Sequence, residues 1–292
     1  MHVLLATKMT SLDLFGEYVR KKVADGLLTS DHLEAMQRGH RDHQETFANL
    51  RESLDKGGIT HVAVSHGRYW PDVDQFDAVI AVGGDGTVLE ASHHVENSRV
   101  PILGLRSSPQ SIGHLCAYDR TEIEALISDL KHREFTFVLA HRLRAVIHSL
   151  QSNSEIQTPS ILNDFLFCNT NPAATTRYQL SIGDTTEQQM SSGIWLSAPA
   201  GSSAAIQSAG GISTALNSTT FQFKVRELYH PPGKKLLITG QVFDPDFENL
   251  VIENFSDSAI LAPDGHQNSY SLGYGDRITF KRAAPLCLVR RS

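Results

Sequence analysis

A strand that runs straight into a glycine-rich turn and then into a helix is the feature that most constrains this chain. The apolar run Ala78–Val82 leads into Gly83-Gly84-Asp85-Gly86-Thr87, and residues 88–92 then have a helical pattern. Because glycine has no side chain, a bulky anion can approach the backbone, where free N–H groups and the positive end of the helix dipole face it. The turn therefore predicts a phosphate site. Its candidate residues are Gly83, Gly84, Gly86 and Thr87.

The aspartate at the centre of the turn distinguishes it from a simple anion site. The charge of Asp85 would repel a phosphate unless a metal ion or a proton transfer gives the carboxylate a purpose, so the turn indicates chemistry. Its spacing matches neither the P-loop nor the GxGxxG dinucleotide motif. Gly-Asp-Gly runs also occur in ordinary tight turns, and the turn taken alone leaves that structural role open.

The first 135 or so residues alternate short β-branched runs with helical patterns, as in a parallel sheet covered by helices. The segment between residues 31 and 57 carries apolar residues at steps of three and four, which predicts one amphipathic helix. Asp31 and Glu34 are placed as its capping box, and Gly57 as its end. The predicted strands are 3–6, 61–64, 78–82 and 102–105, and a helix is expected over about 121–131.

From Phe135 onward the pattern changes to strand after strand, separated by Asn, Gly, Pro and Asp turns. The predicted strands are 144–147, 163–168, 178–182, 194–197, 235–241, 258–261 and 277–280. A chain of 292 residues is longer than one typical domain. We therefore predict an α/β, Rossmann-like N-terminal domain over residues 1–136 and a predominantly β C-terminal domain over residues 137–292.

Composition argues against several classes of partner. A formal net charge of -6 would repel nucleic acid and acidic membranes, so a polyanionic ligand must be held locally. The three cysteines, Cys116, Cys168 and Cys287, are widely spaced and form no CxxC pair, which argues against a disulfide framework or a zinc site. No apolar run approaches the roughly 18 to 20 residues that span a bilayer. We expect a soluble protein in the reducing cytoplasm, without nucleic-acid or membrane partners.

Two histidines, His40 and His43, fall on the apolar stripe of the long predicted helix. A paired-histidine metal site is conceivable, but no nearby cysteine or carboxylate set completes it, and partly buried histidines on helix faces are common. We therefore favour a structural role for both. The stripe could alternatively meet another subunit.

Two further groups of polar and small residues lie in the second half of the chain. Asn163 and Asp164 stand at the entrance of a predicted strand, where such residues also cap turns. The segment Ala198–Ala204 follows another strand and begins a helix of small residues. Its hydroxyls and free amides would present donors to a ligand, and its alanines would leave room for a flat ring. Close packing of small residues against a sheet is the alternative.

The order of these three groups resembles the NAD kinase family. GGDGT is followed about eighty residues later by Asn163-Asp164, then by a Pro-x-Gly-Ser-Ser-Ala segment and Ser-Ala-Gly-Gly. Asp264-Gly265-His266 and Gly275–Ile278 are similar to the family's terminal motifs. The resemblance extends from Val3 to about Val289.

This resemblance implies transfer of the terminal phosphate of ATP, or of polyphosphate, to the adenosine-ribose 2'-hydroxyl of NAD or NADH, together with Mg²⁺ or another divalent metal. Asp85 is then the catalytic general base, with Gly86 beside it. The resemblance leaves both the donor and the redox state of the acceptor open. The dinucleotide-binding residues that it implies are Asp85, Gly86, Asn163, Asp164, Ser192, Ser203, Ala204, Ser208 and His266.

Some positions depart from the family pattern. Ser191-Ser192-Gly193 stands where the family has Gly-Asp-Gly, Ala205 replaces a tyrosine, and Arg106 replaces an asparagine. Ser191-Ser192-Gly193, together with Gly113–Cys116 in place of Gly-Phe-Leu, resembles the branch that includes the mitochondrial NAD kinases. That resemblance implies a homodimer or a higher homo-oligomer.

Two other functions stay open at this point. A lipid or diacylglycerol kinase also pairs a GGDG turn with a β-rich domain, but it would need a broad apolar opening, and polar loops follow Asp164 instead. A dinucleotide sensor without catalysis would fit the altered residues Ser192 and Ala205, although the intact Asp85 counts against it.

Overall fold

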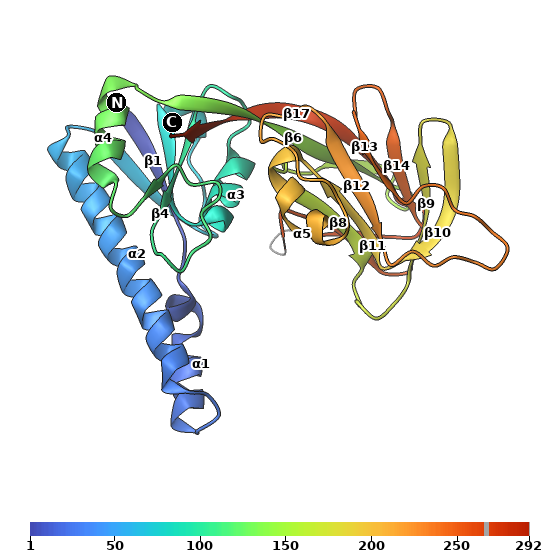
Figure 1. The fold of residues 1–292 in the computed structure, drawn as a ribbon, viewed down its shortest axis with the longest axis horizontal. Helices are drawn as coiled ribbons and strands as arrows, with labels where there is room; N and C mark the ends of the chain where they lie inside the picture. Colours follow the sequence, from blue (N-terminus) through green and yellow to red (C-terminus); the bar gives the residue numbers. More distant parts are fainter. Residues whose placement is uncertain (266–268, 292) are drawn as a thin grey trace. The chain divides into compact units, whose positions relative to one another are not determined.

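The computed structural model describes residues 1–265 and 269–291, and the chain divides into two compact units (Figure 1). The first unit comprises Met1–Val138 together with the residues from Cys287 onward, and the second comprises Leu139–Leu286. The whole C-terminal segment was predicted to belong to the second domain. The end of strand β17 (Arg277–Arg290) belongs to the first unit instead, because Leu288 pairs in parallel with Ile102.

The first unit is built on a parallel sheet. Its strands are β1 (His2–Thr7), β2 (Thr60–Ser65), β3 (Ala78–Gly83) and β4 (Ile102–Arg106), in the order β2-β1-β3-β4, with the short β5 (Tyr118–Asp119) beside β4. All four strands predicted here are confirmed. Since the strands are parallel, their carboxyl ends share one edge, where ligands bind in open α/β sheets.

Four helices belong to this unit: α1 (Ser11–Ala24), α2 (Ser30–Lys56), α3 (Asp85–His94) and α4 (Ile123–His132). The long predicted helix is α2, and its end at Gly57 is confirmed. Its capping box is a wrong prediction, because the N-cap is Thr29 without a side-chain bond, and Asp31 already lies inside the helix. Buried Leu50 and Leu54 join the apolar core under the sheet.

Helix α1 was not predicted, although it carries a complete capping box. The Thr10 N–H donates to Asp13 Oδ2 at 2.8 Å, and the Asp13 N–H donates back to Thr10 Oγ1 at 3.3 Å. The helix packs along the N-terminal half of α2 (Figure 1). This packing brings the carboxyl end of β1, through Thr10, close to the side chains of α2.

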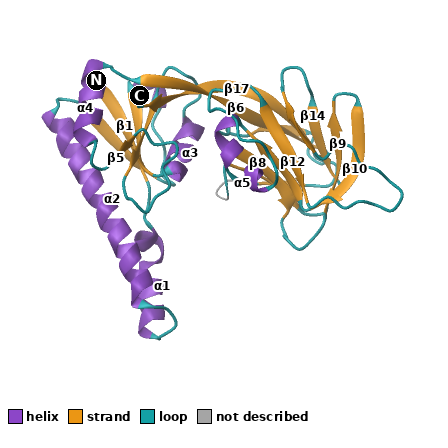
Figure 2. Cartoon of the chain, viewed as in Figure 1, coloured by secondary structure: helices purple, strands orange, loops and turns teal. Residues whose placement is uncertain are grey.

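The regular structure of the second unit is almost entirely strand, apart from a 3-10 turn over Pro199–Ser203 and one helical turn, α5 (Ala205–Ser208) (Figure 2). Its strands are β6 (Thr136–Ser149), β7 (Ser154–Gln157), β8 (Asp164–Asn169), β9 (Thr176–Ile182), β10 (Thr185–Ser191), β11 (Gly193–Ser197), β12 (Phe221–Arg226), β13 (Gly240–Phe243), β14 (Leu250–Asn254), β15 (Ala259–Pro263), β16 (Tyr270–Leu272) and most of β17. The predicted β-rich second half is therefore confirmed.

These strands form two antiparallel layers that share one core. One layer has the order β13-β12-β11-β8-β15-β16, and the other contains β10-β9-β14-β17. Phe167 of the first layer meets Tyr178 of the second edge-on, with ring centroids 5.5 Å apart. The core is therefore filled by inward-facing residues from both layers.

One predicted strand, 235–241, is largely wrong, since β13 begins only at Gly240. The Glu187 carboxylate accepts hydrogen bonds from the N–H groups of Leu237 at 2.8 Å and Ile238 at 3.1 Å. A side chain thus takes the donors that a neighbouring strand would otherwise use, and the segment stays irregular. No helix in the described part of the chain is long and apolar enough to cross a membrane.

Candidate active site

The glycine turn joins β3 to α3 at the carboxyl edge of the parallel sheet. Gly83 ends the strand, Gly84 is the N-cap, and its carbonyl accepts the N–H groups of Thr87 at 3.0 Å and Val88 at 3.3 Å. The helix therefore begins at Asp85, earlier than its sequence pattern predicted. Asp85 and Gly86 occupy the first helical turn, where backbone N–H groups have no partner inside the helix.

The glycines of the turn lack a side chain for different reasons. A Cβ atom on Gly83 would overlap Thr87 Oγ1, and one on Gly84 would lie 2.6 Å from the carbonyl oxygen of Ile112. A Cβ atom on Gly86 would meet no atom of the described chain within 4 Å, and Gly86 is exposed. Packing explains the first two glycines. Gly86 instead leaves an open approach to the helix N-terminus, as an anion that binds the backbone requires.

Asp85 is held by the loop that follows β4. Its Oδ1 accepts the Leu115 N–H at 2.8 Å, and its Oδ2 accepts the His114 N–H at 3.1 Å. The Asp85 N–H in turn donates to the Ile112 carbonyl at 2.9 Å. These bonds fix the carboxylate, and each oxygen keeps a further lone pair that can accept a hydroxyl proton.

Thr87 is buried and its side chain packs against Gly83, so it stabilises the turn.

Cys116 lies in the same loop as the partners of Asp85. Burial, followed by the charge of Asp85, raises the pKa of the Cys116 thiol to about 12. The thiol is therefore neutral at physiological pH and is a poor nucleophile.

In the second unit, Asp264 holds the turn that enters β8. Its Oδ1 accepts the N–H groups of Asn163 at 2.7 Å and Asp164 at 3.0 Å, and its Oδ2 accepts the Leu162 N–H at 2.9 Å. The Asp264 N–H donates to the Asp164 carbonyl at 2.8 Å. Within the described residues the Asn163 side-chain amide makes no hydrogen bond, so its donors and acceptor are available to a ligand.

Asp164 is 7% exposed, and its environment disfavours a charge. Burial and the negative charge of Asp264 raise the pKa of Asp164 to about 7. The raised pKa favours the protonated form of the Asp164 carboxyl group up to about neutral pH. A protonated Asp164 can donate as well as accept a hydrogen bond.

The small-residue segment lies directly against Asn163. The Ala198 N–H donates to the Asn163 carbonyl at 2.8 Å, and a Cβ atom on Gly201 would overlap that same carbonyl oxygen. Gly201 is therefore a packing residue, as is Ser202, whose buried hydroxyl accepts the Thr214 N–H at 2.9 Å. The candidates Ser203, Ala204 and Ser208 are exposed or half-buried on the same segment.

Ser192 is not brought to this group. Ser192 lies at the beginning of β11, whereas the small-residue segment that contacts Asn163 begins after the end of β11. The five residues of this strand separate Ser192 from that segment by about 16 Å. The Ser192 N–H instead donates to the Arg226 carbonyl at 3.1 Å. His266 lies outside the described residues.

The two helix histidines have structural partners. His43 is buried, with Nε2 3.0 Å from Thr7 Oγ1 and Nδ1 2.9 Å from Ser107 Oγ. Burial lowers its pKa to about 4, so the ring is neutral. His40 Nδ1 lies 2.8 Å from Thr10 Oγ1. The described chain contains no group of three or more His, Cys, Asp or Glu side chains able to hold a metal ion.

Two residues of this region were not predicted from the sequence to have a role in the site. The first is Asp264, whose anchoring role was not predicted. The Asp264-Gly265 pair was its sequence signal, because such pairs are typical of tight turns, and Asp264 does have a left-handed backbone (φ 45°). Lys8, directly after β1, was not singled out either. Its position at the carboxyl end of a parallel strand was the only signal for it.

The fold and the turn define a class: a two-unit protein with a glycine-rich turn between a strand and a helix at the edge of a parallel sheet, and with a β-rich second unit. A family model described as the ATP-NAD kinase N-terminal domain matches residues 20–135. The NADH kinase of Arabidopsis thaliana is 31% identical over 265 residues, which cover 85% of this chain and 83% of that protein. The chain belongs to the NAD kinase family.

Other relatives agree. A probable NADH kinase of Oryza sativa subsp. japonica is 28% identical over 272 residues, covering 85% of this chain and 81% of that protein. The crystal structure of yeast NADH kinase complexed with NADH has a TM-score of 0.72 at 17% identity, covering 100% of this chain and 84% of that one. An NAD kinase from Archaeoglobus fulgidus in complex with ATP has a TM-score of 0.67 at 16% identity, covering 99% and 94%. These two structures share the fold.

Proposed function

We propose that this chain is an NAD(H) kinase, which transfers the terminal phosphate of ATP to the adenosine-ribose 2'-hydroxyl of the dinucleotide. The observation that carries the proposal is Asp85, a carboxylate fixed by two N–H groups beside the open Gly86 at a helix N-terminus. Relatives named NADH kinase and similar structures that contain NADH or ATP support both substrates.

In the proposed reaction Asp85 accepts the proton of the 2'-hydroxyl while that oxygen attacks the terminal phosphorus of the donor. The bond between this phosphorus and the bridging oxygen breaks, and ADP leaves with the electron pair. The backbone of the glycine turn and the N-terminus of α3 stabilise the phosphate charge. Positioning and charge neutralisation supply most of the catalysis, as in other phosphoryl transfers.

The dinucleotide would be held by Asn163 and Asp164. The side-chain amide of Asn163 and the protonated carboxyl group of Asp164 can each both donate and accept, which suits ribose hydroxyls and an adenine edge. Asp264 would position both residues through their backbone. The adjoining small-residue segment would add further contacts to the dinucleotide through Ser203, Ala204 and Ser208.

A divalent metal also belongs to the proposal. Asp85 is the only carboxylate in the turn, and Mg²⁺ in kinases is held mainly by substrate phosphates and water with one or two carboxylates. The residues therefore fit an ion that arrives with the donor and is held by its phosphates and by water, which leaves Asp85 to act as the base. When bound, such an ion neutralises phosphate charge.

We further propose a homodimer in a reducing, cytoplasmic setting. The resemblance to the mitochondrial branch supports the dimer, and the three free cysteines support the reducing compartment. Sedimentation of the purified chain at a mass near 32.1 kDa would contradict the dimer, whereas twice that mass would support it.

The function is tested by incubating the protein with NAD or NADH, with ATP or inorganic polyphosphate, and with Mg²⁺ or Mn²⁺. We expect NADP or NADPH to form with ATP, measured by the reduction or oxidation of the product in a coupled dehydrogenase assay. Diacylglycerol with radiolabelled ATP is the control. Labelled lipid without labelled dinucleotide would overturn the proposal.

The open position at Gly86 gives a second test. Gly86→Ala should leave the unfolding temperature unchanged or higher, because alanine favours helix over glycine. It should slow phosphate transfer by about tenfold or more, since a methyl group would occupy the approach to the backbone. Gly84→Ala is the matched variant and should lower the unfolding temperature. A fully active Gly86→Ala enzyme would show that this approach is unused.

A further inference from the structure

A pocket of about 520 Å³ lies at the amino edge of the parallel sheet, opposite the glycine turn. Its walls come from segments that are far apart in the sequence: the start of β1, the residues before β3 and β4, and the segment after α4. Phe76 and Pro101 precede the two strands, and Phe135 and Phe137 follow the helix. All of these residues belong to the first unit, and none has a role in the proposed reaction.

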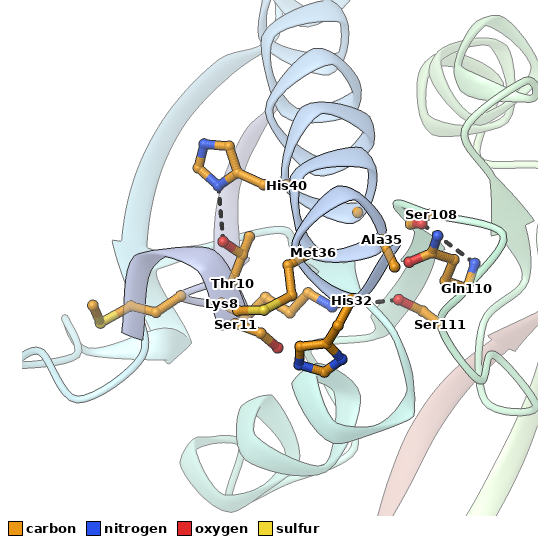
Figure 3. Close-up of a pocket in the computed structure, with 12 residues that line it drawn as sticks. Lys8, Thr10, Ser11, His32, Ala35, Met36, His40, Ser108, Gln110 and Ser111 are labelled. Carbon is orange, nitrogen blue, oxygen red and sulfur yellow. Dashed lines mark hydrogen bonds between the residues drawn. The ribbon is translucent and has the colours of Figure 1, made fainter. Parts of the chain in front are cut away.

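This pocket is separate from the site of phosphate transfer. A smaller pocket, of about 370 Å³, lies at the carboxyl edge, where Lys8 Nζ donates to Ser111 Oγ at 3.3 Å (Figure 3). The six residues of β3 separate the two edges of the sheet by roughly 20 Å. A small molecule at the amino edge therefore does not reach Asp85 or the transferred phosphate.

Aromatic side chains form the apolar wall of the pocket at the amino edge. The ring centroids of Phe135 and Phe137 are 5.8 Å apart, with their planes tilted by 58°. Phe76 is buried, and its ring stacks on His2 with the centroids 4.7 Å apart. Phe137 is 48% exposed although it lines a concave site, so its ring is open to a ligand. Pockets of this volume with aromatic walls typically hold small organic molecules.

Two guanidinium groups line the same pocket. Arg99 is fixed, because its Nη2 donates to Asp74 Oδ2 at 3.4 Å and its backbone N–H donates to Asn97 Oδ1 at 2.8 Å. The exposed Arg133 has no hydrogen bond or ion pair to any residue that the structure describes. A guanidinium group presents several N–H donors in one plane, which suits a carboxylate, sulfonate or phosphate.

The two carboxylates of the pocket already have donors within the chain. Asp77 Oδ2 accepts the His2 N–H at 2.7 Å, and Asp74 Oδ1 accepts the side-chain amide of Asn97 at 2.8 Å. These bonds stabilise both negative charges. The guanidinium group of Arg133 therefore remains the charged group that a ligand can bind.

The backbone of Arg133 supports a role beyond ending the helix. Arg133 is the C-cap of α4 in the left-handed conformation, with φ 56° and ψ 36°. Glycine is common in this conformation, and a residue with a Cβ atom is less favourable there. Lys131 and His132 already supply basic side chains to the last turn of α4. An arginine at this position is thus explained better by what its guanidinium group binds.

We propose that this pocket binds a small planar anion, an aromatic ring system that carries a carboxylate, sulfonate or phosphate group. Phe135 and Phe137 hold the ring, and Arg133 and Arg99 bind the negative group. The inference goes beyond the proposed function, because the pocket shares no residue with the proposed site of phosphate transfer.

The anionic half is tested with two dyes that share one ring system, the charged anilinonaphthalene sulfonate and the uncharged phenylnaphthylamine. Fluorescence titrations of the full chain contain excess β,γ-imido-ATP and NAD, so that dye at the substrate sites is displaced. Arg133→Gly should weaken the sulfonated dye about tenfold or more and leave the uncharged dye within about twofold. Its unfolding temperature should stay unchanged or rise, since glycine suits the left-handed backbone.

Asn153→Gly is the matched control for this substitution. Asn153 also has a positive φ (49°) and lies in an exposed turn of the second unit. This variant should bind both dyes as the wild type does.

The aromatic half is tested by Phe137→Ser, which should weaken both dyes about tenfold, because both lose the same ring contact. Phe247→Ser is its control. It removes a ring that is 88% exposed in the second unit, and it should change the affinity for neither dye. Thermal unfolding of each variant shows whether the fold is intact.

Wild-type affinity for the sulfonated dye in both Arg133→Gly and Phe137→Ser would overturn the inference. So would a wild type that binds neither dye once the substrate sites are filled. Loss of both dyes in Arg133→Gly together with a lower unfolding temperature would give Arg133 a structural role and contradict the anion site. If dye binding falls as protein concentration rises and Phe137→Ser sediments at a lower mass than the wild type, a second copy of the chain occupies the pocket instead. None of these readings depends on turnover, so the proposed function is tested separately by its own assay.

Discussion

Replacing Asp85 with asparagine is expected to lower kcat for phosphate transfer by about 10²- to 10⁴-fold, the range for loss of a general base. An amide cannot take the proton of the attacking hydroxyl. The dissociation constant for NAD should stay within a few fold of the wild-type value, because an asparagine can still bond the 2'-hydroxyl and the other proposed dinucleotide contacts lie in the second unit. Initial rates at saturating NAD and ATP, with NAD binding measured by calorimetry, check this result.

Asp85 also has a structural role that this experiment must separate. Both of its oxygens accept N–H groups from the loop at His114 and Leu115, and an asparagine NH₂ group would face one of those donors. An unsatisfied N–H costs about 1–3 kcal/mol. Hydrogen exchange of residues 113–116 and the unfolding temperature of Asp85→Asn therefore report on the loop independently of turnover.

Asp72→Asn is the matched control. Asp72 caps the 3-10 turn Val73–Gln75 by accepting the Asp74 N–H at 3.1 Å, in the same unit but outside the turn region. Because asparagine caps a helical turn about as well as aspartate does, this variant should keep both its stability and its activity. Wild-type turnover in Asp85→Asn would exclude the general-base role. If turnover is lost only together with the hydrogen-exchange protection of residues 113–116, the role of Asp85 is to hold this loop in place and not to act as a base.

Much of the first unit was predictable because its signals are local. The runs at 3–6 and 78–82 are apolar and rich in β-branched residues, which is typical of buried strands. The glycines after Val82 allow the next helix to begin close to the end of the strand. Helix α1 escaped prediction because its burial pattern is weak: only Gly16 and Val19 are buried, while Leu14, Phe15 and Tyr18 are exposed. Its true signal was the Thr10 and Asp13 capping box.

The site was only partly predictable, since its geometry depends on strand pairing. Asp264 holds Asn163 and Asp164 from about 100 residues away, and it reaches them because β15 pairs with β8 in a register that puts Pro263 opposite Phe165. No local pattern encodes that register. Ser192 was grouped with these residues by motif order alone, and the length of β11 separates them.

The Asp164 and Asp264 pair carries the other large expected effect, a dependence of stability on pH. Asp164 has a pKa of about 7 in the folded chain and an ordinary value of 3.8. Between these values the folded state keeps a proton that the unfolded state has released. The contribution of Asp164 to the free energy of unfolding is therefore fully present below about pH 4, falls as pH rises, and is lost above about pH 7.

The difference between a pKa of about 7 and 3.8 corresponds to a loss on the order of 4 kcal/mol across this range. His43 acts in the opposite direction, because its folded pKa of about 4 lies below its ordinary 6.5. We therefore compare the free energy of unfolding in urea of the wild type with that of Asp164→Asn at each pH. The contribution of His43 is the same in both proteins and cancels in the difference.

Relative to the wild type, Asp164→Asn should gain stability steadily from pH 4.5 to pH 8, since asparagine keeps a donor and cannot ionise beside Asp264. Asp184→Asn, in the exposed turn between β9 and β10, should show no such trend. A difference that is independent of pH would mean that Asp164 ionises normally. If a protonated Asp164 donates to the dinucleotide, NAD affinity of the wild type should also fall as pH rises through about 7, while that of Asp164→Asn should not. The pH dependence of stability and the pH dependence of NAD affinity would then both report the proton on Asp164, so the same ionisation would affect the folding of this turn and the binding of its ligand.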